Sequence, residues 1–244
     1  MSLFDVSGKT ALVTGGGSGL GQFMAKALAE AGVRIYLVGR REDRLRETLG
    51  DNDGVVFPLD LVERGSTDRL FALVASQSPQ PDIIVNAAGI NPRRHADEIS
   101  ETDWHYSVDL NLNVPFLVSQ KFVPHMKQAG WGRIINITSL QSSRAFENGI
   151  SYGAAKGGVL QLTRAMAEAW SRFGVTANAL APGFFLTEQN RALLTNTDGS
   201  LTQRGQQIID QTPMGRYGTP DDLVGITLWL CGEESKYLFY QRYY

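Results

Sequence analysis

The sequence predicts a single α/β domain with helices on both faces of a doubly wound parallel sheet. Six short apolar runs rich in Val and Ile alternate with longer helix-like segments along the 244 residues. The runs are continuously apolar, which indicates strands covered on both faces. No internal repeat, low-complexity tract or Pro/Ser-rich linker divides residues 1–244, so we expect one domain.

The expected elements alternate regularly along the chain. The expected strands are, in order, TALVTG, RIYLVG, VVFPLD, DIIVNAAG, RIINITS and VTANALAP. Helices are expected near residues 19–31, 41–49, 64–77, 101–129, 152–173 and 219–232. In such a βαβ order, ligands bind beyond the carboxyl ends of the strands. The polar stretch 190–207 is expected to form a mobile cap over that site.

Composition argues against several classes of protein. The 23 basic and 25 acidic residues nearly cancel, so neither nucleic acid nor an acidic membrane surface is an expected partner. Cys231 is the only cysteine and MSLFDVSGKT lacks the pattern of a secretion signal, which favours the cytoplasm. No apolar run reaches the roughly 18–20 residues of a membrane-spanning helix. The spacing of His95, His105 and His125 matches no metal-binding motif, so no metal is expected.

A glycine-rich segment, TGGGSGLG at residues 14–21, joins the first expected strand to the first expected helix. Gly15, Gly19 and Gly21 permit a tight turn and a close approach of the backbone to a pyrophosphate, whose charge a helix N-terminus favours. A flexible turn is the alternative interpretation. The surrounding βαβ order favours nucleotide binding.

The end of the second expected strand bears on the choice of cofactor. Gly39 stands where an acidic residue would bind a ribose 2′-hydroxyl, and Arg40 and Arg41 follow it. Because guanidinium groups bind phosphate oxygens well, NADP(H) is favoured, and NAD(H) is the alternative. In a second interpretation the segment RREDRLRE begins a solvated helix whose arginines pair with Glu42, Asp43 and Glu47.

Two further strands end on polar residues. Asp60, after the third strand, can accept a hydrogen bond from an adenine amino group. Asn86, in the segment NAAG after the fourth strand, either holds the loop near a cofactor or satisfies backbone donors at the strand end.

Tyr152 and Lys156 are the strongest candidates for acid/base chemistry. They lie one turn apart on the same face of an expected helix. A neighbouring ammonium lowers a phenol pKa from about 10 toward the range of an acid/base catalyst. Ser139 ends the fifth strand and can hydrogen-bond a carbonyl or alcohol oxygen. Asn111 lies inside an expected helix, where Asn is a poor helix former; an exposed or water-bonded Asn is the alternative.

These motifs, in this order, resemble the short-chain dehydrogenase/reductase family over nearly the whole chain. The matching segments are TGGGSGLG, NAAG, YGAAK and the pair Pro182 and Gly183 followed by Thr187, together with Asn111 and Ser139. The resemblance implies a Rossmann fold and a hydride transfer between a nicotinamide and a carbonyl or secondary alcohol. It also implies a catalytic tetrad of Asn111, Ser139, Tyr152 and Lys156.

The family resemblance further implies a role for each of these residues. Tyr152 gives or takes the proton, Ser139 orients the substrate oxygen, and Asn111 supports a water-linked proton relay. Lys156 lowers the tyrosine pKa and holds the nicotinamide ribose. The implied cofactor-binding residues are Gly15, Gly17, Ser18, Gly19, Leu20, Gly21, Arg40, Asp60, Leu61, Asn86, Ala87, Gly89, Tyr152, Lys156, Pro182, Gly183, Phe185 and Thr187.

The runs AAKGGVLQLTRAMAEAWSRFGVTANALAPGFFLTE and TPMGRYGTPDDLVG are most similar to gluconate 5-dehydrogenase and 2-deoxygluconate dehydrogenase members of the family. That similarity implies a sugar-acid or polyol-like substrate. The candidate substrate-binding residues are Arg93, Arg94, Gln141, Arg144 and Asn148. One alternative is a 3-oxoacyl-carrier-protein reductase or general ketone reductase, which Phe146, Phe184 and Phe185 would suit. Another is a catalytically silent dinucleotide-binding protein.

The sequence departs from the family at residues 236–244, which read KYLFYQRYY. The family's usual last strand is therefore expected to be missing or replaced. Because that strand commonly contributes to a tetramer interface, we expect a homo-oligomer, a dimer or tetramer, whose assembly is weakened if the strand is absent.

Overall fold

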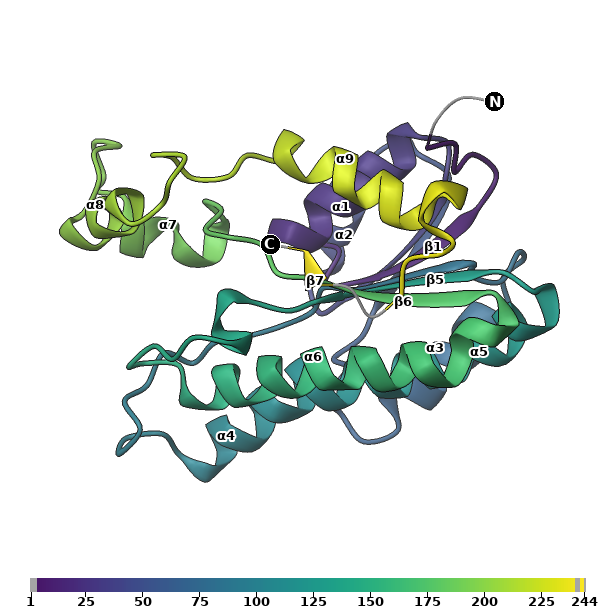
Figure 1. Cartoon of the computed structure of the whole chain (residues 1–244), viewed down its shortest axis with the longest axis horizontal. Helices are drawn as coiled ribbons and strands as arrows, with labels where there is room; N and C mark the ends of the chain where they lie inside the picture. The colour runs from purple at the N-terminus through teal and green to yellow at the C-terminus, as the bar shows by residue number, and fades with distance from the viewer. Residues whose placement is uncertain (1–3, 240–241, 244) are drawn as a thin grey trace.

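The structure is a computed structural model that describes residues 4–239 and 242–243 (Figure 1). Within these residues a parallel sheet runs in the order β3-β2-β1-β4-β5-β6-β7. The strands are β1 (Thr10–Thr14), β2 (Arg34–Gly39), β3 (Gly54–Pro58), β4 (Ile83–Asn86), β5 (Gly132–Ile137), β6 (Val175–Leu180) and β7 (Arg242–Tyr243). The strand order reverses between β1 and β4, and a cleft for ligands is expected at that reversal.

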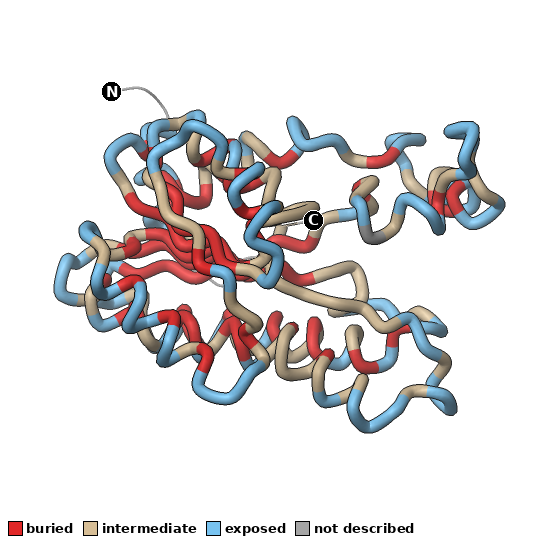
Figure 2. Tube along the Cα trace, turned by 180° about the vertical axis from the view of Figure 1, so that it is seen from behind, coloured by how far each residue is buried: buried red, intermediate tan, exposed pale blue. Residues whose placement is uncertain are grey.

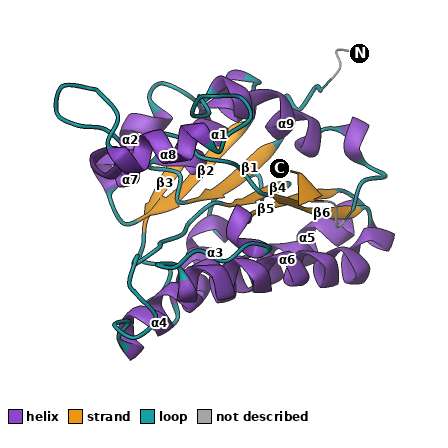
Figure 3. Cartoon of the chain, turned by 60° about the vertical axis from the view of Figure 1, so that its left-hand side comes forward, coloured by secondary structure: helices purple, strands orange, loops and turns teal. Residues whose placement is uncertain are grey.

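Helices cover both faces of the sheet (Figures 1 and 3). On one face lie α1 (Gly19–Glu30), α2 (Glu42–Leu49) and α9 (Asp221–Cys231). On the other lie α3 (Ser66–Ala75), α4 (Glu101–Val108), α5 (Val114–Ala129) and α6 (Ile150–Trp170). The doubly wound architecture expected from the sequence is therefore confirmed.

The core consists of two apolar layers, one on each side of the sheet. Alternate residues of each strand point to opposite layers, so Val13 of β1 joins Met24 and Leu28 of α1, whereas Leu12 joins Phe122 of α5. The central strands are buried along their whole length, as Figure 2 shows. This burial explains why the strands appear in the sequence as continuous apolar runs.

The helix expected over 101–129 is interrupted. Between α4 and α5, residues Asp109–Asn113 form a π-helical turn that is wider than the turns on either side. Asn111 lies at the centre of this turn and is fully buried. The interruption therefore coincides with the residue that the sequence marks as a poor helix former.

The polar stretch 190–207 contains parts of two helices, α7 (Glu188–Leu194) and α8 (Gln203–Asp210). They extend beyond the end of the sheet at the left of Figure 1. Their contact is a small separate apolar cluster of Leu194, Ile208 and Tyr217. This pair of helices has little of the core's packing to hold it in place, so it suits a cap over a site.

The C-terminal segment forms a two-residue strand. Tyr243 O accepts a hydrogen bond from Ala181 N at 2.6 Å, and the Tyr243 ring packs edge-on against Trp229 at 5.3 Å between centroids. The short strand β7 therefore extends the sheet beside β6, in the segment where the family's usual last strand is expected to be missing or replaced. Residues 240, 241 and 244 lie outside the described part. Among the described helices, none has both the length and the apolar composition that crossing a bilayer requires.

Candidate active site

Two adjoining cavities lie at the carboxyl ends of the strands. The first, of about 270 Å³, and the second, of about 420 Å³, share the wall residues Gly15, Ser18, Ala88 and Gly89. These residues follow β1 and β4, the two strands between which the strand order reverses. The cavities therefore form one continuous cleft at the position expected for a ligand of a doubly wound sheet.

The glycine-rich turn forms the floor of the cleft. Gly15 has a left-handed φ of +68°, and a Cβ there would lie 2.8 Å from the backbone of Ala88. A Cβ on Gly21 would lie 2.5 Å from Gly15 O, so this glycine lets α1 pack closely against the turn. The N-terminus of α1 borders the cleft, and the side chain of its N-cap residue, Ser18, makes no capping hydrogen bond. This cradle fits a dinucleotide pyrophosphate.

The reactive groups meet at the first cavity. Tyr152 and Lys156 lie on α6, and Ser139 lies just after β5, at the start of a short turn of 3₁₀ helix. The Ser139 side chain is hydrogen-bonded to Tyr152 and also accepts the Gln141 N–H at 3.1 Å. Lys156 Nζ lies 5.6 Å from the centre of the Tyr152 ring and donates to Ile137 O at 2.6 Å.

Burial governs the pKa values of the two titratable groups. It raises the pKa of Tyr152, while the hydrogen bond from Ser139 and the charge of Arg93 lower it by less. Burial also lowers the pKa of Lys156 to about 8. Desolvation of the phenol thus outweighs the attraction of nearby charges. That Lys156 lowers the tyrosine pKa stays a prediction.

Asn111 lies behind the cleft wall. Its Nδ2 donates to Ile90 O at 2.7 Å and to Ser107 O at 2.8 Å. Its Oδ1 accepts no hydrogen bond from the described residues, and a Cβ on Gly89 would lie 2.6 Å from it. Asn111 is therefore a buried residue fixed beside Gly89 and Lys156, and the alternative of an exposed helix Asn is wrong.

The second cavity is bordered by arginines and acidic residues. Arg40 donates to the Tyr106 hydroxyl at 3.2 Å, and that hydroxyl donates to Asp60 at 3.4 Å. Arg41 pairs instead with Glu188 at 3.2 Å. The solvated-helix interpretation holds for the later arginines of the segment RREDRLRE, because Arg44 pairs with Glu47 and Arg46 with Glu42. It does not hold for Arg40 and Arg41, whose partners are Tyr106 and Glu188.

The structure brings most of the predicted site residues to the cleft. Those on its walls are Gly15, Gly17, Ser18, Gly19, Leu20, Arg40, Asp60, Leu61, Ala87, Gly89, Arg93, Ser139, Gln141, Tyr152, Lys156, Pro182, Gly183, Phe185 and Thr187. Arg94, Arg144 and Asn148 are exposed and line neither cavity, because their loops turn their side chains to solvent. Asn86 is buried and donates to Asn136 Oδ1 at 2.8 Å, so it ties β4 to β5.

Other residues on the cavity walls were not predicted from the sequence. Tyr106 and Glu188 line the second cavity, and Asn91 and Asn190 line the first. Asn190 had a readable signal, because the spacing Thr187-x-x-Asn190 is a capping box and Asn190 Oδ1 accepts the Thr187 N–H at 2.8 Å. No sequence pattern marks Tyr106 or Glu188, since only the folded chain brings them near Arg40 and Arg41.

Comparisons with known proteins agree with this geometry. A family model described as short chain dehydrogenase matches residues 9–198. The chain is 36% identical to 2-dehydro-3-deoxy-D-gluconate 5-dehydrogenase of Bacillus subtilis, over 96% of this chain and 92% of that protein. It is 34% identical to gluconate 5-dehydrogenase of Gluconobacter oxydans, over 97% and 92%.

A solved structure is similarly close. The gluconate 5-dehydrogenase of Burkholderia cenocepacia, in complex with NADP and tartrate, matches with a TM-score of 0.86 and 36% identity over 98% of this chain and 94% of that one. The cleft at the sheet reversal, the Ser139–Tyr152–Lys156 group and these full-length matches lead to one conclusion. The chain belongs to the short-chain dehydrogenase family and is an NAD(P)-dependent oxidoreductase.

Proposed function

We propose that this protein transfers a hydride between NADP(H) and the keto or secondary alcohol carbon of a sugar acid. The observation that carries the proposal is a Tyr152 phenol that is hydrogen-bonded to Ser139 on a cavity wall and is acted on by the charge of Arg93. A proton donor, an oxygen-orienting hydroxyl and a cation for a carboxylate thus surround the same cavity.

The protein's own residues handle the proton. The nicotinamide, when bound, supplies or accepts the hydride. In the direction of reduction, Tyr152 donates its proton to the substrate oxygen as negative charge develops there, and Ser139 hydrogen-bonds the same oxygen. The raised pKa of Tyr152 keeps it protonated at neutral pH, which is the form that reduction requires. Lys156 and the glycine-rich turn would hold the nucleotide beside these groups.

The arginines of the second cavity support NADP(H) as the cofactor. Gly39 leaves room where an acidic side chain would repel a phosphate, and Arg40 and Arg41 border the same cavity. The related gluconate 5-dehydrogenase of Burkholderia cenocepacia was solved in complex with NADP. We therefore expect tighter binding of NADP(H) than of NAD(H).

Arg93 is the proposed partner of the substrate carboxylate. Its backbone has a left-handed φ of 55°, an uncommon conformation for a residue with a side chain, and its N–H donates to Asn91 Oδ1 at 3.1 Å. This turn places Arg93 on the wall of the first cavity, close enough to Tyr152 to lower the pKa of the phenol. Two relatives are named for substrates of the gluconate type, which carry a carboxylate.

Replacing Arg93 with Ala is expected to raise KM for a keto-gluconate about 10- to 100-fold, because a charged hydrogen-bond partner contributes about 1.5–3 kcal/mol. The KM for an uncharged ketone should change by less than about twofold if carboxylate binding is the only loss. Arg94→Ala is the matched control, since Arg94 is exposed and lies on neither cavity wall. Equal losses for charged and uncharged substrates would contradict this role.

A panel of substrates tests the proposed function as a whole. The absorbance of NADPH and NADH is followed with 5-ketogluconate, a deoxyketogluconate, an acetoacetyl thioester and simple ketones. The keto acids should react fastest, with NADPH. Faster turnover of the thioester would favour a 3-oxoacyl reductase, which Phe146, Phe184 and Phe185 on the cavity wall would suit. Tight NADPH binding without turnover of any member would favour a silent binding protein.

Assembly and location belong to the same proposal. The layer of α3 and α5 exposes three large apolar side chains, Phe71, Leu73 and Leu117, which supports a homo-oligomer, a dimer or tetramer. Sedimentation velocity measures its size. Cys231 is buried, and burial raises the pKa of its thiol to about 12, so it is an unreactive thiol suited to a reducing cytoplasm.

A further inference from the structure

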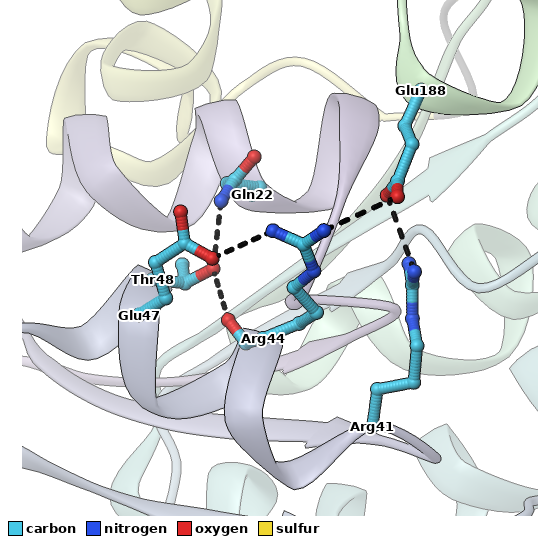
Figure 4. Close-up of polar contacts among 6 residues, drawn as sticks. All are labelled: Gln22, Arg41, Arg44, Glu47, Thr48 and Glu188. Carbon is cyan, nitrogen blue, oxygen red and sulfur yellow. Dashed lines mark hydrogen bonds and ion pairs between the residues drawn. The ribbon is translucent and has the colours of Figure 1, made fainter.

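Glu188 connects the cap to the cofactor end of the cleft. It is the first residue of α7, and its carboxylate lies between two guanidinium groups that follow β2 (Figure 4). Arg41 Nη1 lies 3.2 Å from Glu188 Oε2, and Arg44 Nη2 lies 3.4 Å from Oε1. Glu188 and Arg41 both line the second cavity. The Glu188 carboxylate, 147 positions along the chain from Arg41, therefore borders the second cavity, whose arginines support NADP(H) as the cofactor.

Two guanidinium groups that share a carboxylate can also share a phosphate. Arg40, the residue that sequence reasoning favours for this role, faces Tyr106 instead. The exposed fractions of the Glu188, Arg41 and Arg44 side chains are 53%, 49% and 40%, so solvent screens both pairs and makes them weak. A phosphate with two negative charges is expected to displace a single carboxylate from such a site.

The same residue bears on the reactive end of the cleft. Thr187 immediately precedes Glu188, lines the first cavity and approaches Gly19, where a Cβ would lie 3.4 Å from Thr187 Cγ2. Asn190 fixes this start of α7 by accepting the Thr187 N–H and donating to Phe185 O at 2.8 Å. A movement of Glu188 would therefore act on its neighbour Thr187, which lies on the wall of the first cavity.

We propose that Glu188 is a latch that competes with the 2′-phosphate of NADP(H) for Arg41 and Arg44. The inference rests on the proposed use of NADP(H). With the latch closed, Glu188 holds the start of α7 against α2. A 2′-phosphate on the two arginines releases Glu188 and frees α7, whereas a dinucleotide without this phosphate leaves the latch closed. Glu188 therefore lowers the affinity for NADP(H) and makes the position of the cap depend on which cofactor is bound.

Titration calorimetry of Glu188→Gln tests the competition. The variant is expected to bind NADPH about 3- to 10-fold more tightly than the wild type, with the Kd for NADH changed by less than about twofold. Glu47→Gln is the matched control, because Glu47 pairs with Arg44 at 2.9 Å but lines neither cavity. If Glu47→Gln tightens NADPH binding as much as Glu188→Gln does, the loss of any negative charge near Arg44 explains the tighter binding, and the latch is refuted.

Amide hydrogen exchange of α7 tests the release directly. In the wild type, 2′,5′-ADP should speed exchange in α7 and 5′-AMP should not; Glu188→Gln should exchange fast without either nucleotide. Binding of 2′,5′-ADP that leaves exchange in α7 unchanged would overturn the latch alone. If 2′,5′-ADP binds no more tightly than 5′-AMP, the phosphate site is absent, and both the latch and the proposed preference for NADP(H) fail.

Discussion

Replacing Tyr152 with Phe is expected to lower kcat by about 10²- to 10⁴-fold, the usual contribution of a positioned proton donor. The ring and its packing are kept, so the change removes only the hydroxyl that is hydrogen-bonded to Ser139. The Kd for NADPH should stay within about threefold, because the cleft is lined mainly by other residues. Steady-state kinetics and a separate binding titration measure the two quantities.

Tyr106→Phe is the matched control for this variant. Tyr106 also places a phenol in the cleft, but its hydroxyl lies between Arg40 and Asp60 in the second cavity. This control is expected to change NADPH binding more than kcat. A Tyr152→Phe enzyme that keeps kcat within about tenfold would contradict the role of Tyr152 as proton donor.

The fold was largely predictable from the sequence, because parallel strands buried on both faces leave an unambiguous signal. All six apolar runs form strands, with bounds that differ by a few residues. The division of 101–129 into two helices was not predicted, since a π-helical turn keeps the helical pattern of side chains on both sides. The strand β7 was not expected either, because two residues, Arg242 and Tyr243, are too few to show a pattern.

The candidate site was predictable where short motifs carry the chemistry. Tyr152, Lys156 and Ser139 converge as expected, because a helical turn and a strand end fix their positions. Electrostatic relations were less predictable. Whether Arg40 or Arg41 meets a carboxylate depends on side-chain directions and on Glu188, which is remote in sequence. The raised pKa of Tyr152 likewise reflects burial, which spacing along a helix does not reveal.

The second large effect is expected from Lys156→Met, which should abolish turnover and stabilise the ligand-free protein at pH 7. Lys156 is fully buried, and burial lowers its pKa from 10.5 to about 8. At pH 7 the folded chain therefore holds a desolvated ammonium, which donates a hydrogen bond to Ile137 O. Removing that charge should raise the free energy of unfolding by about 1–3 kcal/mol. Catalytic residues often reduce stability in this way.

The pH dependence of stability separates this explanation from a simple packing effect. Below about pH 8 the folded and unfolded chains both hold the Lys156 proton, so the cost of burial is fully present. Between about pH 8 and 10.5 the folded chain has released the proton and the unfolded chain has not, so wild-type stability should rise with pH. Urea unfolding below pH 10 is the appropriate measurement. Above pH 10 the unfolded chain loses the Tyr152 proton while the folded chain, in which the pKa of Tyr152 is raised, keeps it, so stability falls as pH rises.

The Met variant should lack the rise in stability between pH 8 and 10, so its advantage over the wild type should shrink across that interval. Lys26→Met is the matched control: it removes an exposed ammonium from α1 and should change stability by less than about 0.5 kcal/mol. A Lys156→Met protein that is less stable than the wild type at pH 7 would mean that the hydrogen bond to Ile137 outweighs the cost of burial. A stable variant that still turns over substrate would instead remove Lys156 from the catalytic group.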